Sequence, residues 1–284
     1  MQKKKYYLKV IINNKGENNK NQRKKKNTKI SKNKWEKELK IIEKQLLNPK
    51  IDYVFKRIFG RVGNEEITTA LIQAITKIKI SDLKLDNSTI LERDIIDDKI
   101  GILDIKGKID NNINCNIEMQ VADRKNAEKR IMFYWSKEYS RSIKKGQDYN
   151  KLEKTICILI IDYELKKLEK IPKYITKWNL REEDYGKFIL TDVLELYIIE
   201  LPKFTRYNGN KKYTKLDEWI KFIENPEVID MENTNKEVKK AKEVLEEISQ
   251  DEHERYLTEL RQKYILDQKA IEDAGYDKRL WKWI

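Results

Sequence analysis

Two stretches of alternating apolar residues, separated by a turn sequence, constrain the fold of this chain more than any other feature. The turn Asp110-Asn111-Asn112 is flanked by the sequences ILDIKGKI and NCNIEMQV. Asp and Asn tolerate the left-handed conformation of hairpin turns, so the pattern predicts two paired strands. Side chains alternate between the two faces of a strand. Asp104 and Lys106 therefore share a face of the first strand, and Glu118 and Gln120 share a face of the second.

The two carboxylates are unexpected in strands of this kind. If the strands pair, Asp104 and Glu118 can converge on one side of a sheet, and a carboxylate without a partner is costly to bury. A divalent cation removes that cost, because Mg²⁺ takes one or two carboxylates together with waters and phosphate oxygens. The alternative is an ordinary sheet with one solvated face, on which Asp104 and Lys106 are simply exposed.

The order of the expected elements predicts an α/β fold. A helix pair, three strands, a helix and a further strand give a small mixed sheet with helices on its faces. The apolar segment Lys154 to Tyr163 is typical of a strand in the middle of a covered sheet. The expected helices are 35–47, 51–59, 64–77, 124–145 ending at Gly146, and 216–226, with further helices from 233 onward, one of them starting at the capping-box sequence 249–252. The expected strands are in 82–95, 102–109, 114–121, 154–163 and the end of 190–204, where a helix start precedes a strand that stops at Pro202.

The charge of the chain is unevenly distributed. The first 50 residues hold 17 Lys and Arg against four Asp and Glu, which accounts for the whole net charge of +13. Residues 1–34 are mostly polar and aperiodic, so we expect a basic disordered arm there. Such an arm can contact nucleic-acid phosphates, although an AT-rich coding sequence produces the same composition. We divide the remainder into a domain over 35–225 and a helical C-terminal extension over 226–284.

Several classes of protein are disfavoured. No run of about 18 apolar residues occurs, so we expect no membrane span. Cys115 and Cys157 lie in apolar strand-like segments, which favours reduced thiols and a cytoplasmic location over a disulfide framework. His253 is the single histidine and lies in a charged helical stretch, so neither a zinc site nor a histidine-based triad is expected.

At the two acidic strands the sequence resembles the PD-(D/E)XK nucleases, which carry Asp in one strand and Glu-x-Lys or Glu-x-Gln in the next. It is most similar to the Rpn-type recombination-promoting nucleases, a branch also described as PD-(D/E)XK family transposases. The resemblance covers Asn48 to Lys203, with weaker likeness in the helical tail. It is carried by NPKIDYVFKRIFG, GILDIKGK, NIEMQ, RIMFYWSKEYSRSIKKGQDY and LTDVLELYIIELPK.

The resemblance implies a restriction-endonuclease-like core of order αβββαβ and an enzyme that hydrolyses DNA phosphodiester bonds with Mg²⁺ or Mn²⁺. It implies a link to recombination or mobile elements, DNA as the partner, and compatibility with a homodimer. Asp104 and Glu118 fall on the metal-binding positions. Gln120 falls on the position that is Lys in the parent superfamily and Gln in this branch.

The glutamine departs from the parent pattern in a way that matters for chemistry. The lysine normally helps to orient the attacking water and to offset developing charge. Gln120 can orient a water but supplies no charge, so Lys106 is our candidate for that charge. Asp52 and Glu65 are weaker candidates for a further acid, and surface placement or helix capping is the favoured interpretation for both.

Three functions remain open from the sequence. We favour an active metal-dependent DNA endonuclease. A catalytically weak or inactive nucleic-acid-binding protein of the same fold is the alternative, supported by Gln120, and an unrelated α/β scaffold or interaction protein is the third. In the helix expected over 124–145, we expect the aromatic residues Tyr134, Trp135 and Tyr139 to be core. Its basic residues either contact a DNA backbone or form a solvated face: Arg130, Lys137, Arg141, Lys144 and Lys145.

Overall fold

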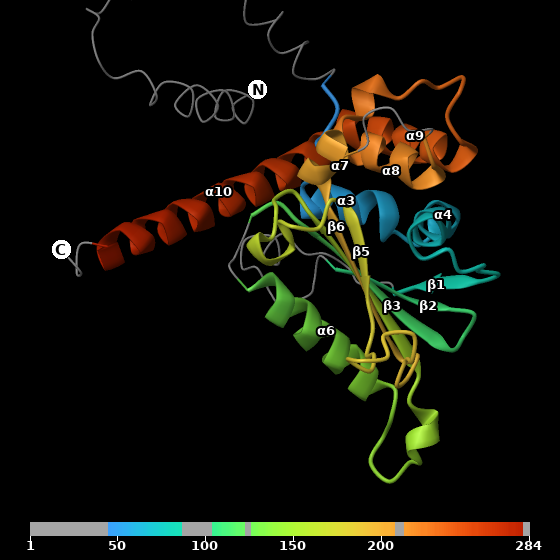
Figure 1. Ribbon diagram of the computed structural model, residues 1–284. Coiled ribbons are helices and arrows are strands. Elements are labelled where there is room, and N and C mark those ends of the chain that lie inside the picture. The colour runs from blue at the N-terminus through green and yellow to red at the C-terminus, as the bar shows by residue number, and fades with distance from the viewer. Residues whose placement is uncertain (1–44, 87–103, 123–125, 208–212, 281–284) are drawn as a thin grey trace, which may run out of the picture. The chain divides into compact units, whose positions relative to one another are not determined.

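The structure is a computed structural model that describes residues 45–86, 104–122, 126–207 and 213–280. All of these residues belong to one compact unit, Glu43–Ile284. The helices of this unit are α3 (Asp52–Phe59), α4 (Glu65–Thr76), α6 (Ala127–Arg141), α7 (Leu201–Tyr207), α8 (Lys215–Glu224), α9 (Lys236–Gln250) and α10 (Glu252–Leu280) (Figure 1).

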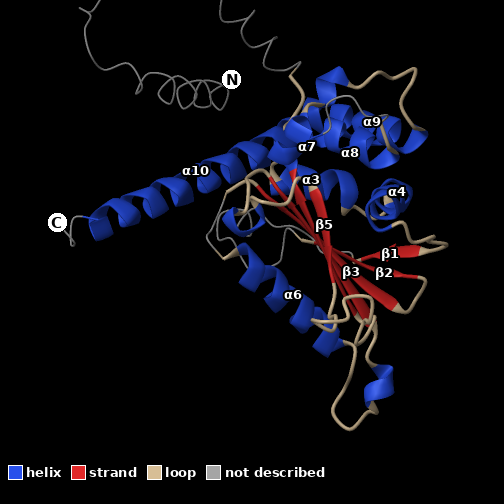
Figure 2. Ribbon diagram, viewed as in Figure 1, coloured by secondary structure: helices blue, strands red, loops and turns tan. Residues whose placement is uncertain are grey.

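A mixed six-stranded sheet forms the centre of the unit (Figure 2). The strand order is β1-β2-β3-β4-β6-β5, with β3–β4 and β4–β6 parallel and the other pairs antiparallel. Strand β4 therefore lies between two parallel neighbours, as its continuous apolar sequence predicts. The strands are β1 (Leu83–Leu85), β2 (Ile105–Ile109), β3 (Ile113–Gln120), β4 (Lys154–Ile161), β5 (Ile175–Trp178) and β6 (Leu194–Glu200).

Helices cover both faces of the sheet. On one face, Ile105, Ile117 and Ile158 belong to a large apolar cluster shared with α3, α4, α8 and α9. On the other face, Leu159 and Ile161 pack in a smaller cluster with residues of α6. Figure 1 shows α6 and α4 on opposite sides of the strands. The predicted α/β class, with a mixed sheet flanked by helices, is confirmed.

The two C-terminal helices contribute to the larger cluster as well. Val238, Leu245 and Ile248 of α9 and Leu257 of α10 are buried in it. The capping pattern near residue 249 marks the start of α10 correctly, and Asp251 provides the cap by accepting hydrogen bonds from the backbone N–H groups of His253 and Glu254. The boundary between 35–225 and 226–284 stays a prediction. In the part of the chain that the structure describes, we find no helix of the length and apolarity needed to cross a membrane.

Three local predictions are wrong. Residues 190–193, directly before β6, are not helical. Strand β6 itself ends at Glu200 rather than at Pro202. Pro202 lies in the first turn of α7, where the missing backbone N–H has no helical partner to lose. Helix α6 ends at Arg141, and Gly146, with φ +84°, lies in a turn beyond it instead of ending the helix.

Other differences concern short or partly described elements. Strand β5 was not expected, since only one of its four residues is fully buried and its sequence shows no apolar alternation. Of the helix expected over 35–47, only 45–47 are described, and these are not helical. The strand expected within 82–95 is limited to β1 in the described part, and 87–95 lie outside it.

Candidate active site

The predicted hairpin is present and aligns its two acidic residues. Asp110 and Asn111 adopt φ of 47° and 62°, the left-handed conformation that their side chains tolerate. In the β2–β3 register Ile105 lies opposite Ile117, so Asp104, one residue before β2, lies opposite Glu118. Side chains directly opposite in an antiparallel pair have Cβ atoms about 5 Å apart on the same face. The hairpin therefore brings the two carboxylates together, as the sequence predicts.

Both carboxylates are withdrawn from solvent. The exposed fraction is 5% for Asp104 and 5% for Glu118, and Gln120 beside them is 8% exposed. The Oδ2 atom of Asp104 is buried and has no hydrogen-bond partner among the residues that the structure describes. Buried carboxylate oxygens are normally bonded. Among the described residues, no side chain therefore supplies a partner for this oxygen of Asp104.

Glu118 is held by two donors on one oxygen. Its Oε1 accepts a hydrogen bond from Gln120 Nε2 at 2.7 Å and lies 2.6 Å from Arg130 Nη2 of α6. Gln120 is itself fixed, because its Oε1 accepts from the Tyr163 hydroxyl at 2.8 Å. The Tyr163–Gln120–Glu118–Arg130 chain therefore orients the glutamate in the absence of any bound cation.

The pKa values of the two carboxyl groups reflect burial and the charges around them. Burial raises the pKa of Asp104 from its ordinary 3.8 to about 7, and the charge of Glu118 adds to this effect, opposed chiefly by Arg130. Burial likewise raises the pKa of Glu118, while Arg130 and the hydrogen bond from Gln120 lower it. Two carboxyl groups with raised pKa values in one site are typical of functional sites.

Lys106 lies on the same face, as predicted, but it has a partner of its own. Its Nζ is 2.5 Å from Glu138 Oε1 of α6. Lys106 lowers the pKa of Asp104, although by less than Arg130 does. Much of its positive charge is therefore balanced by Glu138, and its catalytic role stays a prediction.

Lys56 is a second cation near Asp104, and the sequence interpretation did not include it. Its side chain lies in α3 and is 5% exposed. Burial lowers the pKa of Lys56 to about 8, an effect that the charge of Asp104 opposes. The available signal was the sequence of the helix, DYVFKRIF, which has apolar residues on both sides of the lysine. In the structure most residues of α3 are buried, and Lys56 is buried with them.

The two weaker acid candidates have structural contacts. Asp52, at the start of α3, accepts hydrogen bonds from Arg261 Nε at 2.9 Å and Nη2 at 2.6 Å, which ties α10 to α3. Glu65, at the start of α4, accepts from the Gly63 backbone N–H at 2.8 Å. The Glu65 contact agrees with the capping interpretation that the sequence favours, whereas Asp52 is not a surface residue: it joins α3 to α10, and its charge raises the pKa of Glu118.

The site fits a divalent cation that is only partly held by protein. Asp104 and Glu118 supply two carboxylates, and one of their oxygens is buried without a partner. Within the described ranges no group of three or more His, Cys, Asp or Glu side chains is placed to hold a metal ion. Mg²⁺ commonly takes only one or two carboxylates and completes its shell with waters and substrate phosphate. A pair is therefore sufficient for this ion and insufficient for a closed structural metal site.

The raised pKa of Asp104 makes the stability of the cation-free protein depend on pH. Between about pH 4 and pH 7 the folded state retains a proton that the unfolded state releases, so raising the pH through this range lowers the free energy of unfolding. Asp104→Asn cannot ionise and should escape this loss. We expect its advantage in urea unfolding with EDTA to grow by on the order of 2 kcal/mol from pH 5 to pH 8, since a tenfold change in proton affinity corresponds to about 1.4 kcal/mol.

Added divalent cation gives the control for that measurement. At pH 8 it should stabilise the wild-type protein and leave Asp104→Asn nearly unchanged, because a ligand that binds only the folded state stabilises it. An advantage of Asp104→Asn that is the same at both pH values would contradict a buried, ionising Asp104.

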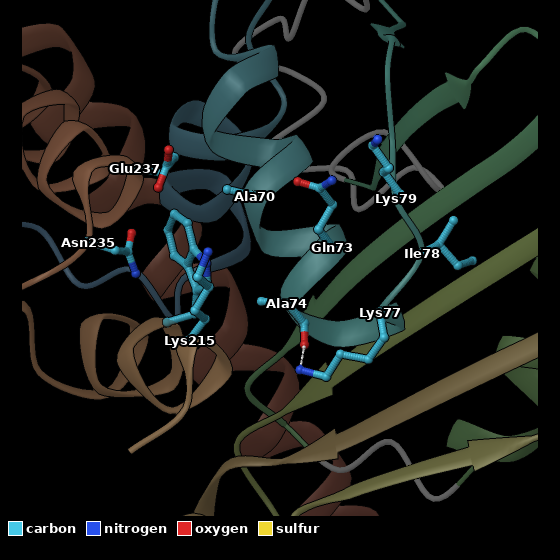
Figure 3. A pocket seen from close by; sticks show the side chains of 10 residues that line it. Ala70, Gln73, Ala74, Lys77, Ile78, Lys79, Lys215, Asn235 and Glu237 are labelled. Carbon is cyan, nitrogen blue, oxygen red and sulfur yellow. Dashed lines mark hydrogen bonds between the residues drawn. The ribbon is translucent and has the colours of Figure 1, made fainter. Parts of the chain in front are cut away.

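A separate cavity of about 450 Å³ lies among α4, α8 and the start of α9. Its lining mixes Lys77, Lys79 and Lys215 with Glu237 and apolar atoms of Trp219. Lys77 turns back to donate to the Ala74 carbonyl at 2.7 Å (Figure 3). None of the predicted site residues lines this cavity, so it does not belong to the carboxylate pair.

Comparison with known proteins agrees with the hairpin chemistry. The family model of the PD-(D/E)XK nuclease family transposases matches residues 49–275, well over half of the chain. The chain belongs to this family. The match extends from α3 into α10, and it supports a nuclease-type function for the fold that presents Asp104 and Glu118. Neither a curated protein nor a solved structure matches the chain.

Family membership removes the third function considered from the sequence, an unrelated scaffold whose hairpin carboxylates do not meet. It leaves open whether this PD-(D/E)XK protein is an active nuclease. The contacts of Arg130 and Tyr163 with the Glu-x-Gln segment are the features that sequence interpretation missed. For Arg130 the sequence predicts only a contact with a DNA backbone or with solvent, because no local pattern reveals a contact between a helix and a strand.

Proposed function

We propose that this protein is a Mg²⁺-dependent DNA endonuclease that acts in the cytoplasm in recombination or in the movement of mobile elements. The observation that carries the proposal is the buried pair of Asp104 and Glu118 on opposed strands, with no partner for Asp104 Oδ2 among the residues that the structure describes. Membership of a nuclease family supports the same conclusion. The buried free thiols of Cys115 and Cys157 are compatible with a reducing compartment.

In this proposal Asp104 and Glu118 hold the cation, and Mn²⁺ can replace Mg²⁺. When bound, such a cation polarises a phosphate and lowers the pKa of a coordinated water. An amide carries two N–H donors, and Gln120 uses one of them on Glu118, so the other can orient the attacking water. The water gives up a proton to solvent as its oxygen bonds to phosphorus, the phosphorus–oxygen bond to the sugar breaks, and the departing oxygen takes up a proton from solvent. Lys106, on the same face, adds positive charge that it shares with Glu138.

The surroundings of the site suit a polyanionic substrate. Basic residues in the second half of α6, Lys137 and Arg141, are exposed on the helix that covers this face of the sheet. The basic segment 1–34 lies outside the described residues, and we propose that it adds affinity for DNA without base specificity. A homodimer is compatible with this proposal.

An inactive DNA-binding protein of the same fold is the second candidate. The specific observation that favours it is that Gln120 supplies no charge and that Arg130 occupies an oxygen of Glu118. In that case DNA affinity would persist without turnover.

Supercoiled plasmid distinguishes the two candidates directly. We expect the wild-type protein to nick or linearise plasmid with Mg²⁺ or Mn²⁺ and to leave it intact with EDTA, as measured by gel electrophoresis. Binding of the same plasmid is followed in parallel by mobility shift with Ca²⁺. Binding without cleavage under every divalent cation would select the inactive candidate, and cleavage that survives EDTA would contradict the metal dependence.

A further inference from the structure

Arg130 is placed differently from the other cations near the carboxylate pair. Its Nη2 atom lies 2.6 Å from Glu118 Oε1, whereas Lys106 is bonded to Glu138 and Lys56 is buried in α3. The Arg130 side chain is 28% exposed while that of Glu118 is 7% exposed. The guanidinium thus contacts the buried carboxylate from a side chain that is itself partly open to solvent.

The fold holds Arg130 in this position. It lies in the first turns of α6, where the neighbouring Ala127 and Ile131 are buried against the sheet beside Leu159 and Ile161. The ring of Tyr134, one helical turn further on, lies under the guanidinium at 5.4 Å and is itself 4% exposed. A cation over an aromatic face is stabilised there without losing its charge. Packing of α6 against the sheet and the ring of Tyr134 therefore help to orient Arg130 toward Glu118.

Its electrostatic effect covers the whole site. Arg130 lowers the pKa of Asp104 more than Lys106 or Lys56 does, and it also lowers the pKa of Glu118. Guanidinium groups match phosphate oxygens with paired N–H donors and stay charged at any accessible pH. These are the properties needed where negative charge develops on a phosphate.

We propose that Arg130 supplies, from α6, the positive charge that Gln120 cannot provide, by holding Glu118 before a cation binds and contacting the scissile phosphate during cleavage. This inference rests on the proposed nuclease function and names a catalytic residue for it. In the parent superfamily a lysine both orients the attacking water and offsets the developing negative charge. In this protein Gln120 orients the water, and Arg130 offsets the charge.

The test is a pair of measurements that Arg130→Gln should move in opposite directions. Removing the guanidinium takes a positive charge away from both carboxylates. Mn²⁺ alone should therefore bind more tightly, with a Kd lower by on the order of tenfold in calorimetric titration. Plasmid cleavage at saturating Mg²⁺ should fall by on the order of a hundredfold, the usual effect of losing one group that stabilises developing charge. A residue with a purely structural role would weaken both properties together.

Matched variants locate the effect. Lys129→Gln removes the same charge from the adjacent, exposed position of α6 and should leave both properties near the wild-type values. Arg130→Lys keeps the charge and should retain more cleavage than Arg130→Gln. Adding Gln120→Lys to Arg130→Gln restores a cation at the superfamily position and should recover about tenfold or more of the lost rate. Lys106→Gln should cost less than Arg130→Gln, because Glu138 already balances Lys106.

Defined outcomes overturn the inference. The inference is wrong if folded Arg130→Gln binds Mn²⁺ no more tightly than the wild-type protein. It is also wrong if Arg130→Gln loses no more cleavage than Lys129→Gln, or if Gln120→Lys does not rescue it. If the wild-type protein cleaves no plasmid, the nuclease proposal fails on its own, and the catalytic part of the role of Arg130 fails with it. Tighter Mn²⁺ binding in Arg130→Gln would then still support its contact with the carboxylate pair.

Discussion

Glu118→Gln should abolish DNA cleavage while leaving the fold intact. The substitution keeps the size of the side chain and its ability to accept hydrogen bonds from Gln120 and Arg130. It removes the charge of a proposed cation ligand, so we expect a loss of more than about a hundredfold, the upper end of what outer-shell partners of a metal usually cost. Cleavage of supercoiled plasmid with Mg²⁺ measures the loss, and Mn²⁺ titration should show weakened binding.

The same change at an acid outside the pair provides the control. Glu153 forms an ion pair with Lys108 at 2.7 Å, further along β2, and its side chain is partly exposed. Glu153→Gln should retain cleavage. Asp104→Asn should behave as Glu118→Gln does, since both carboxylates belong to one site. Full activity in either site variant would reject the proposed mechanism.

Lys203→Met should cause the largest loss of stability. Lys203 and Glu200 are both fully buried, with Nζ 2.7 Å from Oε2. Lys203 Nζ also donates to the Leu168 carbonyl at 2.6 Å, and Glu200 Oε1 accepts from the Leu165 N–H at 2.9 Å. The variant leaves a buried carboxylate without its cation, so we expect the free energy of unfolding to fall by about 3–5 kcal/mol.

Urea unfolding followed by tryptophan fluorescence measures this change. Lys167→Met is the matched control, because Lys167 pairs with Glu128 at 2.8 Å but is 78% exposed, and exposed pairs contribute little. Adding Glu200→Gln to Lys203→Met should recover part of the loss, since no unpaired charge then remains buried. A loss in Lys203→Met no larger than in Lys167→Met would contradict the importance of this buried pair.

Local patterns were sufficient to predict the hairpin and its carboxylates. Period-two alternation fixes which residues share a face, and turn residues that tolerate a left-handed conformation fix the register, so Asp104 and Glu118 could be placed opposite each other. The apolar sequence of β4 likewise identified the middle of the sheet. In each case the determining interactions lie within one strand or between neighbours in the chain.

Features set by contacts between distant elements could not be predicted. Arg130 meets Glu118 only because α6 crosses this face of the sheet, and Lys56 is buried only because other helices surround α3. The pairing of β5 with β6 depends on strand addition at an edge, with no alternation to mark it. The end of β6 was predicted at Pro202 because proline interrupts strand pairing, but Pro202 already lies in the first turn of α7, where proline is tolerated.

The distance between the hairpin turn and the carboxylates has a consequence for changes in chain length. Five cross-strand pairs separate the turn from the Asp104–Glu118 pair, about 17 Å of strand. Asp110 anchors the turn by accepting from the N–H groups of Ser81 and Asp82, whereas the side chain of Asn111 accepts only from the exposed Lys84, at 2.6 Å. Added residues after Asp110 can therefore loop outward without altering which side chains face α6. A single residue inserted within β2 or β3 would instead move one carboxylate to the opposite face, so the protein should accept long insertions at the turn and no short ones in its strands.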